Sequence, residues 1–118
     1  MDRYIEKVEP VIKEIITLTN QHKIEWEKVG FGVFRCVDSE DDISMEISRH
    51  NGFVGSAVSL KLYSRNKLEY EYTPSISTKN ASFDDLLNRL YEEAENTNVE
   101  SVGNKFDIIL NSFKKRAK

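Results

Sequence analysis

Residues 43–48 read Ile-Ser-Met-Glu-Ile-Ser, so that apolar and polar side chains alternate one by one. Strict alternation puts every apolar side chain on the same side of a β-strand, which is typical of a strand with one buried and one wet face. The pattern returns in residues 58–63, Val-Ser-Leu-Lys-Leu-Tyr, and in residues 68–72, Leu-Glu-Tyr-Glu-Tyr. Because only short polar stretches separate these segments, we expect them to be neighbouring antiparallel strands.

A fourth strand is predicted upstream, in the β-rich run 31–37. The acidic stretch 38–42 is expected to turn the chain from this strand into the next. Arg49–Gly52 is expected to be a second turn, because it ends in Asn-Gly, a strong hairpin signal. Residues 24–28, Ile-Glu-Trp-Glu-Lys, also alternate, which leaves open a further short strand or an extended lead-in. The sequence therefore predicts a four-stranded antiparallel meander.

Three stripes of apolar residues at helical spacing flank the strands. The first, over residues 4–19, keeps its phase across Pro10, which favours one kinked helix over a turn followed by a helix that starts at Pro10. A second helix is expected to begin at Ser82, where Ser-Phe-Asp-Asp resembles a capping box. Asn96–Asn98 is expected to break this helix before a third one. The second stripe consists of Phe83, Leu86, Leu87, Leu90, Tyr91 and Ala94, and the third of Val99, Val102, Phe106, Ile109, Leu110 and Phe113.

The expected fold is one α+β domain over residues 1–118. It has an N-terminal helix, a four-stranded antiparallel β-meander, and a C-terminal two-helix hairpin packed on the sheet. The hairpin is expected to bring Gly103 beside Tyr91 and the basic C-terminal end beside Asp84 and Asp85. A length of 118 residues with 39% hydrophobic and 31% charged residues fits a single domain of this kind.

Composition excludes several classes of protein. No segment approaches the ~20 consecutive apolar residues of a membrane span, so we expect no membrane partner. The charged start, Met-Asp-Arg-Tyr-Ile-Glu-Lys, does not resemble a secretory signal. The lone cysteine, Cys36, has no internal disulfide partner and is expected to be a reduced thiol. These features predict a cytoplasmic protein.

No catalytic or metal-binding motif stands out. His22 and His50 fall in no recognisable pattern with Cys36, and one cysteine with two scattered histidines does not supply a zinc site. The five glycines match neither a phosphate loop nor a dinucleotide fingerprint. We therefore expect no enzyme activity, no cofactor and no metal, with Cys36 and His50 as the first residues to test for catalysis.

Acidic residues gather in two places, although the net charge is only −3. We take them as candidate contacts for a partner protein with a basic surface; a solvated acidic face is the alternative. The basic end of the chain is expected to complete a helix C-terminus. Direct nucleic-acid binding is not expected, because acidic side chains on the wet sheet face would repel phosphates. The candidate contacts are Glu40, Asp41, Asp42, Glu92, Glu93 and Glu95.

Two other functions stay open. One is a small-ligand or nucleotide-binding module, with an aromatic pocket between sheet and helices formed by Trp26, Tyr63, Tyr70 or Tyr72. The other is a homo-oligomeric structural domain, because an edge strand of an open meander can pair with its copy in a homodimer.

Residues 23–27, Lys-Ile-Glu-Trp-Glu, follow the first helix directly, and Leu86–Tyr91 reads Leu-Leu-Asn-Arg-Leu-Tyr. With the meander between them, these segments resemble a group of small standalone bacterial α+β domains of uncharacterised function. The resemblance implies a bacterial or phage source and a small dedicated binding protein, and it brings no catalytic residues. The leading hypothesis is thus a non-enzymatic protein-binding module, for example an immunity-type or anti-defence inhibitor.

Overall fold

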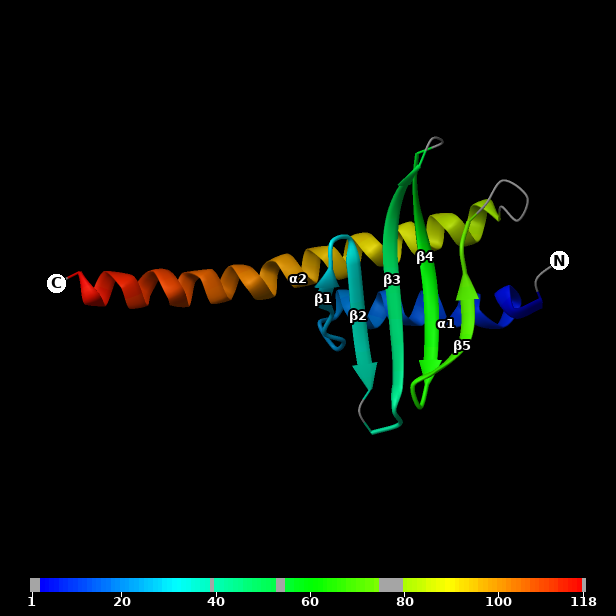
Figure 1. The fold of residues 1–118 in the computed structure, drawn as a ribbon, viewed down its shortest axis with the longest axis horizontal. Coiled ribbons are helices and arrows are strands. Elements are labelled where there is room, and N and C mark those ends of the chain that lie inside the picture. Colours follow the sequence, from blue (N-terminus) through cyan, green and yellow to red (C-terminus); the bar gives the residue numbers. More distant parts are fainter. Residues whose placement is uncertain (1–2, 39, 53–54, 75–79, 118) are drawn as a thin grey trace.

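The structure, a computed structural model, describes residues 3–38, 40–52, 55–74 and 80–117, and gives no side-chain detail for residues 51, 52, 55 and 56. The described chain forms an α+β fold with one antiparallel sheet in the order β1-β2-β3-β4-β5 (Figure 1). The α+β class and the antiparallel meander are therefore confirmed. The elements are α1 (Arg3–Asn20), β1 (Glu27–Gly30), β2 (Val33–Asp38), β3 (Ile43–Gly52), β4 (Gly55–Ser64), β5 (Lys67–Tyr72) and α2 (Ala81–Arg116).

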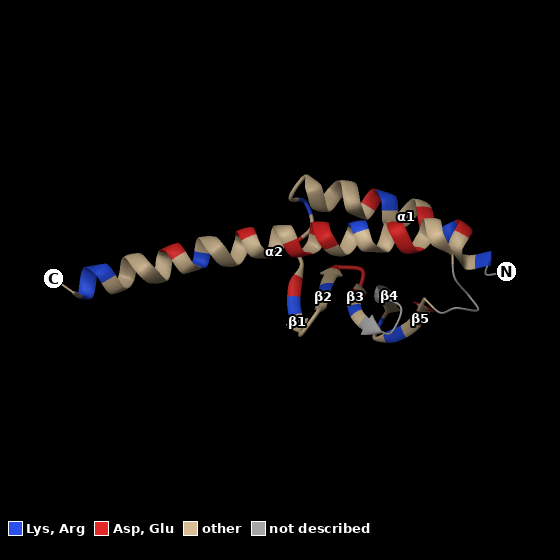
Figure 2. Ribbon diagram, turned by 90° about the horizontal axis from the view of Figure 1, so that it is seen from above, with Lys and Arg blue, Asp and Glu red and all other residues tan. Residues whose placement is uncertain are grey.

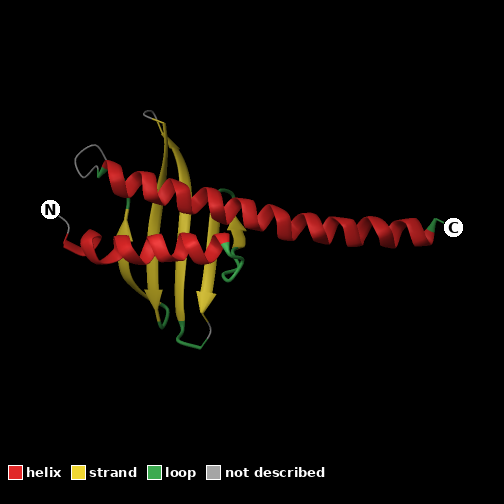
Figure 3. Ribbon diagram, turned by 180° about the vertical axis from the view of Figure 1, so that it is seen from behind, coloured by secondary structure: helices red, strands yellow, loops and turns green. Residues whose placement is uncertain are grey.

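Both helices cover the same face of the sheet and run across its strands, side by side (Figure 3). The ring of Phe83 in α2 meets Tyr72 of β5 edge-on, with centroids 4.8 Å apart. Two turns later, Tyr91 meets Phe34 of β2 in the same way at 5.3 Å. Helix α2 thus passes from the β5 edge toward the β1 edge of the sheet.

The hydrophobic core lies between the two helices and the sheet. The alternating strands bury one face against the helices, as the sequence predicts, while the first half of α2 supplies an apolar row from Phe83 to Ala94. Trp26 closes the end of the core near β1, where its indole N–H donates to Thr19 Oγ1 at 3.0 Å. The buried apolar residues are Ile5, Ile12, Ile16, Trp26, Phe34, Met45, Ile47, Val58, Leu60, Tyr72, Phe83, Leu86, Leu87, Leu90, Tyr91 and Ala94.

Helix α1 continues through Pro10, so the prediction of one helix is confirmed. A proline inside a helix costs about 3 kcal/mol, because it removes one backbone hydrogen bond and crowds the preceding turn. Ile5 precedes Pro10, and Ile12 and Ile16 follow it; all three are buried in the core. Because buried residues lie on both sides of the proline, the two parts of the helix turn the same apolar face toward the core.

The sheet has five strands, so the prediction of four is wrong. The run assigned to one strand at 31–37 contains a tight turn at Phe31-Gly32, and Glu27–Gly30 pairs with β2 across it. Gly32 has a φ of 69°, and a Cβ there would lie 3.3 Å from the carbonyl oxygen of Arg49. Glycine is thus required at this turn. The further short strand left open at residues 24–28 is therefore found in part: β1 begins at Glu27, and all four of its residues are exposed.

Arg49–Gly52 is not a turn, which corrects a second expectation. These residues continue β3, whose pairing with β4 runs to Gly52 opposite Gly55. Pairing along ten residues outweighs the local turn preference of Asn-Gly. The connection between β3 and β4 lies outside the described residues.

Helix α2 begins one residue before the expected Ser82. Its N-cap is Asn80, whose Oδ1 accepts from the Phe83 backbone N–H at 3.1 Å. Ser82 Oγ donates to the same oxygen at 3.0 Å, so the serine supports the cap instead of forming it.

The predicted C-terminal two-helix hairpin is wrong: α2 is one helix of 36 residues that runs through Asn96–Asn98. Thr97 Oγ1 donates to the carbonyls of Glu93 and Ala94 at 2.8 and 3.1 Å, inside the helix. Asn98 Nδ2 donates to the Trp26 carbonyl at 3.0 Å. The polar side chains that suggested a break therefore have partners compatible with a continuous helix. Gly103 does not lie beside Tyr91, since nothing comes within 4 Å of a Cβ built on it.

We expect Thr19→Val to destabilise the fold by about 1–3 kcal/mol, because the buried Trp26 indole N–H would lose its acceptor. Thr17→Val is the matched control: Thr17 is exposed and also donates to a carbonyl four residues earlier in α1. It should stay within ~0.5 kcal/mol of the parent protein. Urea unfolding followed by Trp26 fluorescence makes the comparison, and equal losses in the two variants would contradict the role given to Thr19.

Gly103→Ala should increase the helix content of residues 99–116 by stabilising this part of α2 by about 0.5–1 kcal/mol. The added methyl group meets open space. Backbone chemical shifts measure the change. In a two-helix hairpin, alanine would instead press on Tyr91 and lower stability, which would contradict the single helix.

Candidate functional site

Helix α2 is longer than the sheet that it crosses. Five strands spaced about 4.8 Å apart give a sheet about 19 Å wide. The buried part of α2, from Phe83 to Ala94, spans about 17 Å at 1.5 Å per residue, so it fills that width. Residues 99–116, here called the projecting segment, extend past the β1 edge of the sheet (Figure 1). From residue 104 to residue 117 every residue is exposed.

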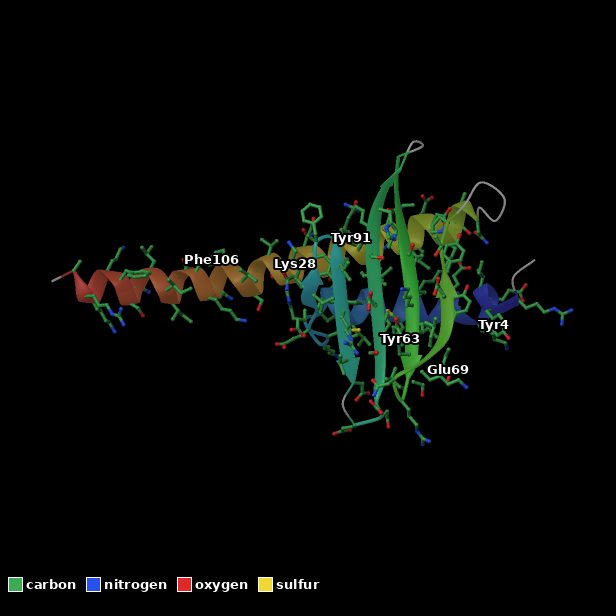
Figure 4. All side chains as sticks on the ribbon, in the orientation of Figure 1. Tyr4, Lys28, Tyr63, Glu69, Tyr91 and Phe106 are labelled. Carbon is green, nitrogen blue, oxygen red and sulfur yellow. The ribbon has the colours of Figure 1, made fainter. Side chains whose placement is uncertain are left out.

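The projecting segment carries a row of large apolar side chains that are exposed, apart from the half-buried Val102. We call Val99, Val102, Phe106, Ile109, Leu110 and Phe113 the apolar stripe. Val99 is 63% exposed, and Phe106 and Phe113 are each 62% exposed. Figure 4 labels Phe106 on the part of α2 beyond the sheet. At 100° per residue, the stripe is rotated by about 120° from the core-facing row of the same helix. It therefore does not continue the contact that α2 makes with the sheet.

Opposite charges lie at the two ends of the apolar stripe. Glu92 and Glu95 are exposed and share its face of the helix, two turns and one turn before Val99 respectively. Residues 101–118 carry five bases against one acid, and three of the bases form the last turn of α2, Lys114–Arg116. Figure 2 shows acidic residues in the middle of α2 and basic residues at its C-terminal end.

An exposed aromatic residue lies close to the acidic end of the stripe. Phe31, in the β1–β2 turn, is 98% exposed. This turn lies beside α2, because a Cβ on Gly32 would be 3.8 Å from the Tyr91 hydroxyl. The Arg49 guanidinium stacks on the Tyr91 ring at 4.1 Å from its centroid. Burial, and then the negative charge of Glu95, raise the pKa of Tyr91, so its phenol stays neutral there.

A cleft of about 650 Å³ lies where the projecting segment leaves the sheet. Its walls come from the connection before β1, from β1 and β2, and from α2 between Thr97 and Lys105. Charges of both signs line it: Glu25 and Glu27 against Lys28, Arg35 and Lys105. Trp26 borders the cleft, but its side chain is buried and its N–H is already bonded. The volume is in the range of small-molecule sites, whereas this mixed polar lining is not typical of them.

The structure does not join the candidate acidic contacts into one surface. Glu40, Asp41 and Asp42 lie at the β2–β3 connection, at the end of the strands away from α2, and Glu92, Glu93 and Glu95 lie on α2 (Figures 1 and 2). Within the α2 group, Glu93 accepts a hydrogen bond from Asn20 Nδ2 of α1 at 3.2 Å. Only Glu92 and Glu95 share the face of the apolar stripe.

Nor does the structure gather the four candidate ligand-binding aromatics in one cavity. Trp26 and Tyr72 are buried in the core, and the Tyr72 hydroxyl donates to Asp84 Oδ1 at 2.6 Å. Tyr70 packs against the same core. Tyr63 follows Leu62 in β4 and lies on the opposite, helix-free face of the sheet (Figure 4). Of the four, only Trp26 borders the cleft.

The helix-free face of the sheet carries its own matched charges. The register places opposite charges side by side across all five strands, in the row Glu27, Arg35, Glu46, Lys61 and Glu71. Such cross-strand neighbours contribute roughly 0.2–1 kcal/mol each and largely neutralise one another's field. A charged partner would therefore be attracted less strongly to this face than to the two ends of the apolar stripe.

The residues singled out for catalysis stay apart. Cys36 packs against the core, and burial raises the pKa of its thiol from 9.0 to about 11 even though a Met45 backbone hydrogen bond lowers it. His50 is near Ser48 Oγ, at 3.2 Å, and His22 is 3.9 Å from Glu100. Among the described residues, no three His, Cys, Asp or Glu side chains are grouped so that they could hold a metal ion.

Neither helix of the described chain combines the length and the apolar character needed to cross a membrane.

Comparison with protein-family models, with curated proteins and with solved structures found no match to this chain. The candidate site therefore depends on the geometry alone. Sequence reasoning found the residues of the apolar stripe but assigned them to a core-facing helix. The signal that it missed is the change of phase between the two stripes, since a single helix cannot turn both toward one sheet.

Cys36 should react with thiol reagents about 100-fold more slowly at pH 8 than an unperturbed cysteine, because its raised pKa leaves correspondingly less thiolate. The control is Val37→Cys in a Cys36→Ser background, which moves the thiol to the exposed neighbour on the same strand. Ellman's reagent measures both rates. A Cys36 as fast as the control would show an accessible thiolate and reopen thiol chemistry.

Proposed function

We propose that the protein is a non-enzymatic protein-binding module that recognises its partner through the apolar stripe of α2. The observation that carries this proposal is a stripe of six large apolar residues, five of them exposed and Val102 half-buried, on one face of a helix that leaves the core. The sheet, α1 and the first half of α2 hold that helix in a fixed direction. In this reading the α+β body is the support, and the projecting segment is the contact surface.

Two physical arguments favour a partner on the stripe. Contiguous exposed apolar surface is rare on monomers and is typical of interaction sites. Most helix stability in proteins comes from packing of the apolar face. The projecting segment touches the body only near its start, through residues such as Glu100, so the rest of it is only marginally helical in water. A partner helix or groove that covers the stripe would supply that packing, as in other helix-in-groove complexes.

The charges at the ends of the stripe support an oriented contact. Glu92 and Glu95 favour a basic group at one end, and Lys114–Arg116 favour an acidic group at the other. Of the acidic contacts expected from the sequence, these two glutamates are the ones on α2 that adjoin the stripe, while Glu40, Asp41 and Asp42 form a separate cluster.

An immunity-type or anti-defence inhibitor stays one concrete version of this proposal. The small-ligand function stays a prediction to be tested at the cleft beside Trp26.

The test compares a stripe variant with a control on the opposite face of the same segment. Phe106→Glu with Ile109→Glu places two charges in the stripe, and Asn104→Glu with Asn111→Glu places two charges on the other side. Proteins captured from the source cells by the tagged chain should be retained by the control and lost with the stripe variant. Reconstitution with the purified partner should then show tighter binding at low salt.

Trp26 fluorescence reports whether the body of each variant is folded, because this side chain is buried at the end of the core. Equal capture by the stripe variant, the control and the parent chain would contradict the proposed function. So would a purified partner whose affinity does not change when the stripe is charged.

A further inference from the structure

We propose that the occupant of the apolar stripe is a second copy of this chain, paired antiparallel through the two projecting segments. This inference rests on the proposed function, since it names the partner of the same surface. Its arguments are the spacing of the stripe, the charges at its two ends and the direction of the stripe relative to the sheet.

The stripe has the spacing of a two-stranded coiled coil. Val99, Val102, Phe106, Ile109 and Phe113 recur at intervals of three, four, three and four residues, the spacing that keeps a seam facing a neighbouring helix. Continued in both directions with the same intervals, the seam includes Glu95 and Glu92 before Val99 and Arg116 after Phe113. One end of the seam is therefore acidic, its middle is apolar, and its other end is basic.

This order of charges favours an antiparallel pair of identical helices. With Phe106 of one copy opposite Ile109 of the other, Phe113 lies opposite Val102 and Arg116 lies opposite Val99. Arg116 is then one turn from Glu95 of the second copy. In the same register Lys115 lies opposite Glu100. A parallel pair in register would instead place basic turn against basic turn and glutamates against glutamates, which destabilises coiled coils.

The direction of the stripe leaves room for the second copy. Because the stripe is rotated by about 120° from the core-facing row, a helix packed on it lies beside α2 and does not compete with the sheet. In the antiparallel pair, the two sheets lie at opposite ends of the helix pair. Phe31 and Tyr91 lie near the acidic end, where the C-terminal turn of the second copy arrives. The interface is the same on both copies, as a two-fold axis requires.

The experiment uses the full chain, two charge variants and their mixture in sedimentation equilibrium. The parent chain should form a dimer that weakens as salt increases. Glu92→Lys with Glu95→Lys makes both ends of the seam basic, and Lys114→Glu, Lys115→Glu and Arg116→Glu together make both ends acidic. Each variant alone should shift toward monomer by at least tenfold in dissociation constant. An equimolar mixture should restore the dimer, because each end then meets its opposite.

Cysteine cross-linking tests the orientation in a Cys36→Ser background. Val102→Cys and Phe113→Cys subunits, mixed and oxidised with glutathione disulfide, should form a disulfide-linked dimer, because the two positions face each other. Neither variant should cross-link with itself, since like positions are about 16 Å apart along the helices and a disulfide needs Cα atoms within about 7 Å. A disulfide formed by Val102→Cys alone would show parallel pairing and overturn the proposal.

The outcomes separate this inference from the proposed function. A parent chain that stays monomeric at high concentration, while the stripe variant loses a captured partner, overturns the second-copy proposal and leaves the proposed function intact. A dimer that persists with Phe106→Glu and Ile109→Glu uses another surface, such as an edge strand, and also overturns it. If the stripe variant changes neither self-association nor capture, both proposals fail.

Discussion

The width of the sheet limits how much of α2 can be buried. Five strands cover about 19 Å, and a helix that crosses them can bury only about three turns before it reaches the last strand. Helix α2 has 36 residues, or about 54 Å, so it cannot fit on this sheet. The exposed stripe, the elongated shape and the proposed mode of binding all follow from that mismatch.

The point where α2 leaves the body is fixed by a small polar network around Trp26. Thr19 of α1 accepts the indole N–H, and Asn98 of α2 donates to the Trp26 carbonyl. Both helices are thus connected to the same residue at the β1 end of the core. Two residues after Asn98, the Glu100 carboxylate lies 3.9 Å from His22 of the body, so the direction of the projecting segment is set in this part of α2. A partner of the stripe would therefore meet a helix whose orientation relative to the sheet is already defined.

Much of the fold could be predicted from alternation and helical spacing. In the strands at 43–48, 58–63 and 68–72, most of the alternating apolar residues are buried against the helices, and Ile43 and Leu68 at the strand ends are exposed. Their alternation therefore predicted both the strands and the buried face. Strand β1 was left open as a short strand or lead-in at 24–28, because its own four residues are exposed and show no buried face. Arg49–Gly52 was taken for a turn because pairing with β4 overrides a local turn signal. Asn96–Asn98 suggested a break, since sequence alone does not show that Asn98 has a partner 72 residues away.

The residues of the apolar stripe could be predicted from the sequence, but their exposure on a projecting helix could not. The third apolar stripe was recognised, yet the assumption that every apolar face must meet the one core placed it in a hairpin. Its phase, about 120° away from that of the second stripe, was the sign that a single helix would leave it exposed. The acidic residues were found in the same way, but only the structure shows that Glu92 and Glu95 adjoin the stripe while Glu40–Asp42 lie elsewhere.

The continuity of α2 can be measured directly with nitroxide labels at positions 85 and 114 of the full chain, diluted with unlabelled protein so that only intramolecular pairs report. A single helix separates these positions by 29 residues, so double electron–electron resonance should give a distance near 44 Å. A hairpin at Asn96–Asn98 would bring the same positions onto neighbouring helices, with axes about 10 Å apart. A short distance of that kind would contradict the projecting helix on which the proposed binding surface depends.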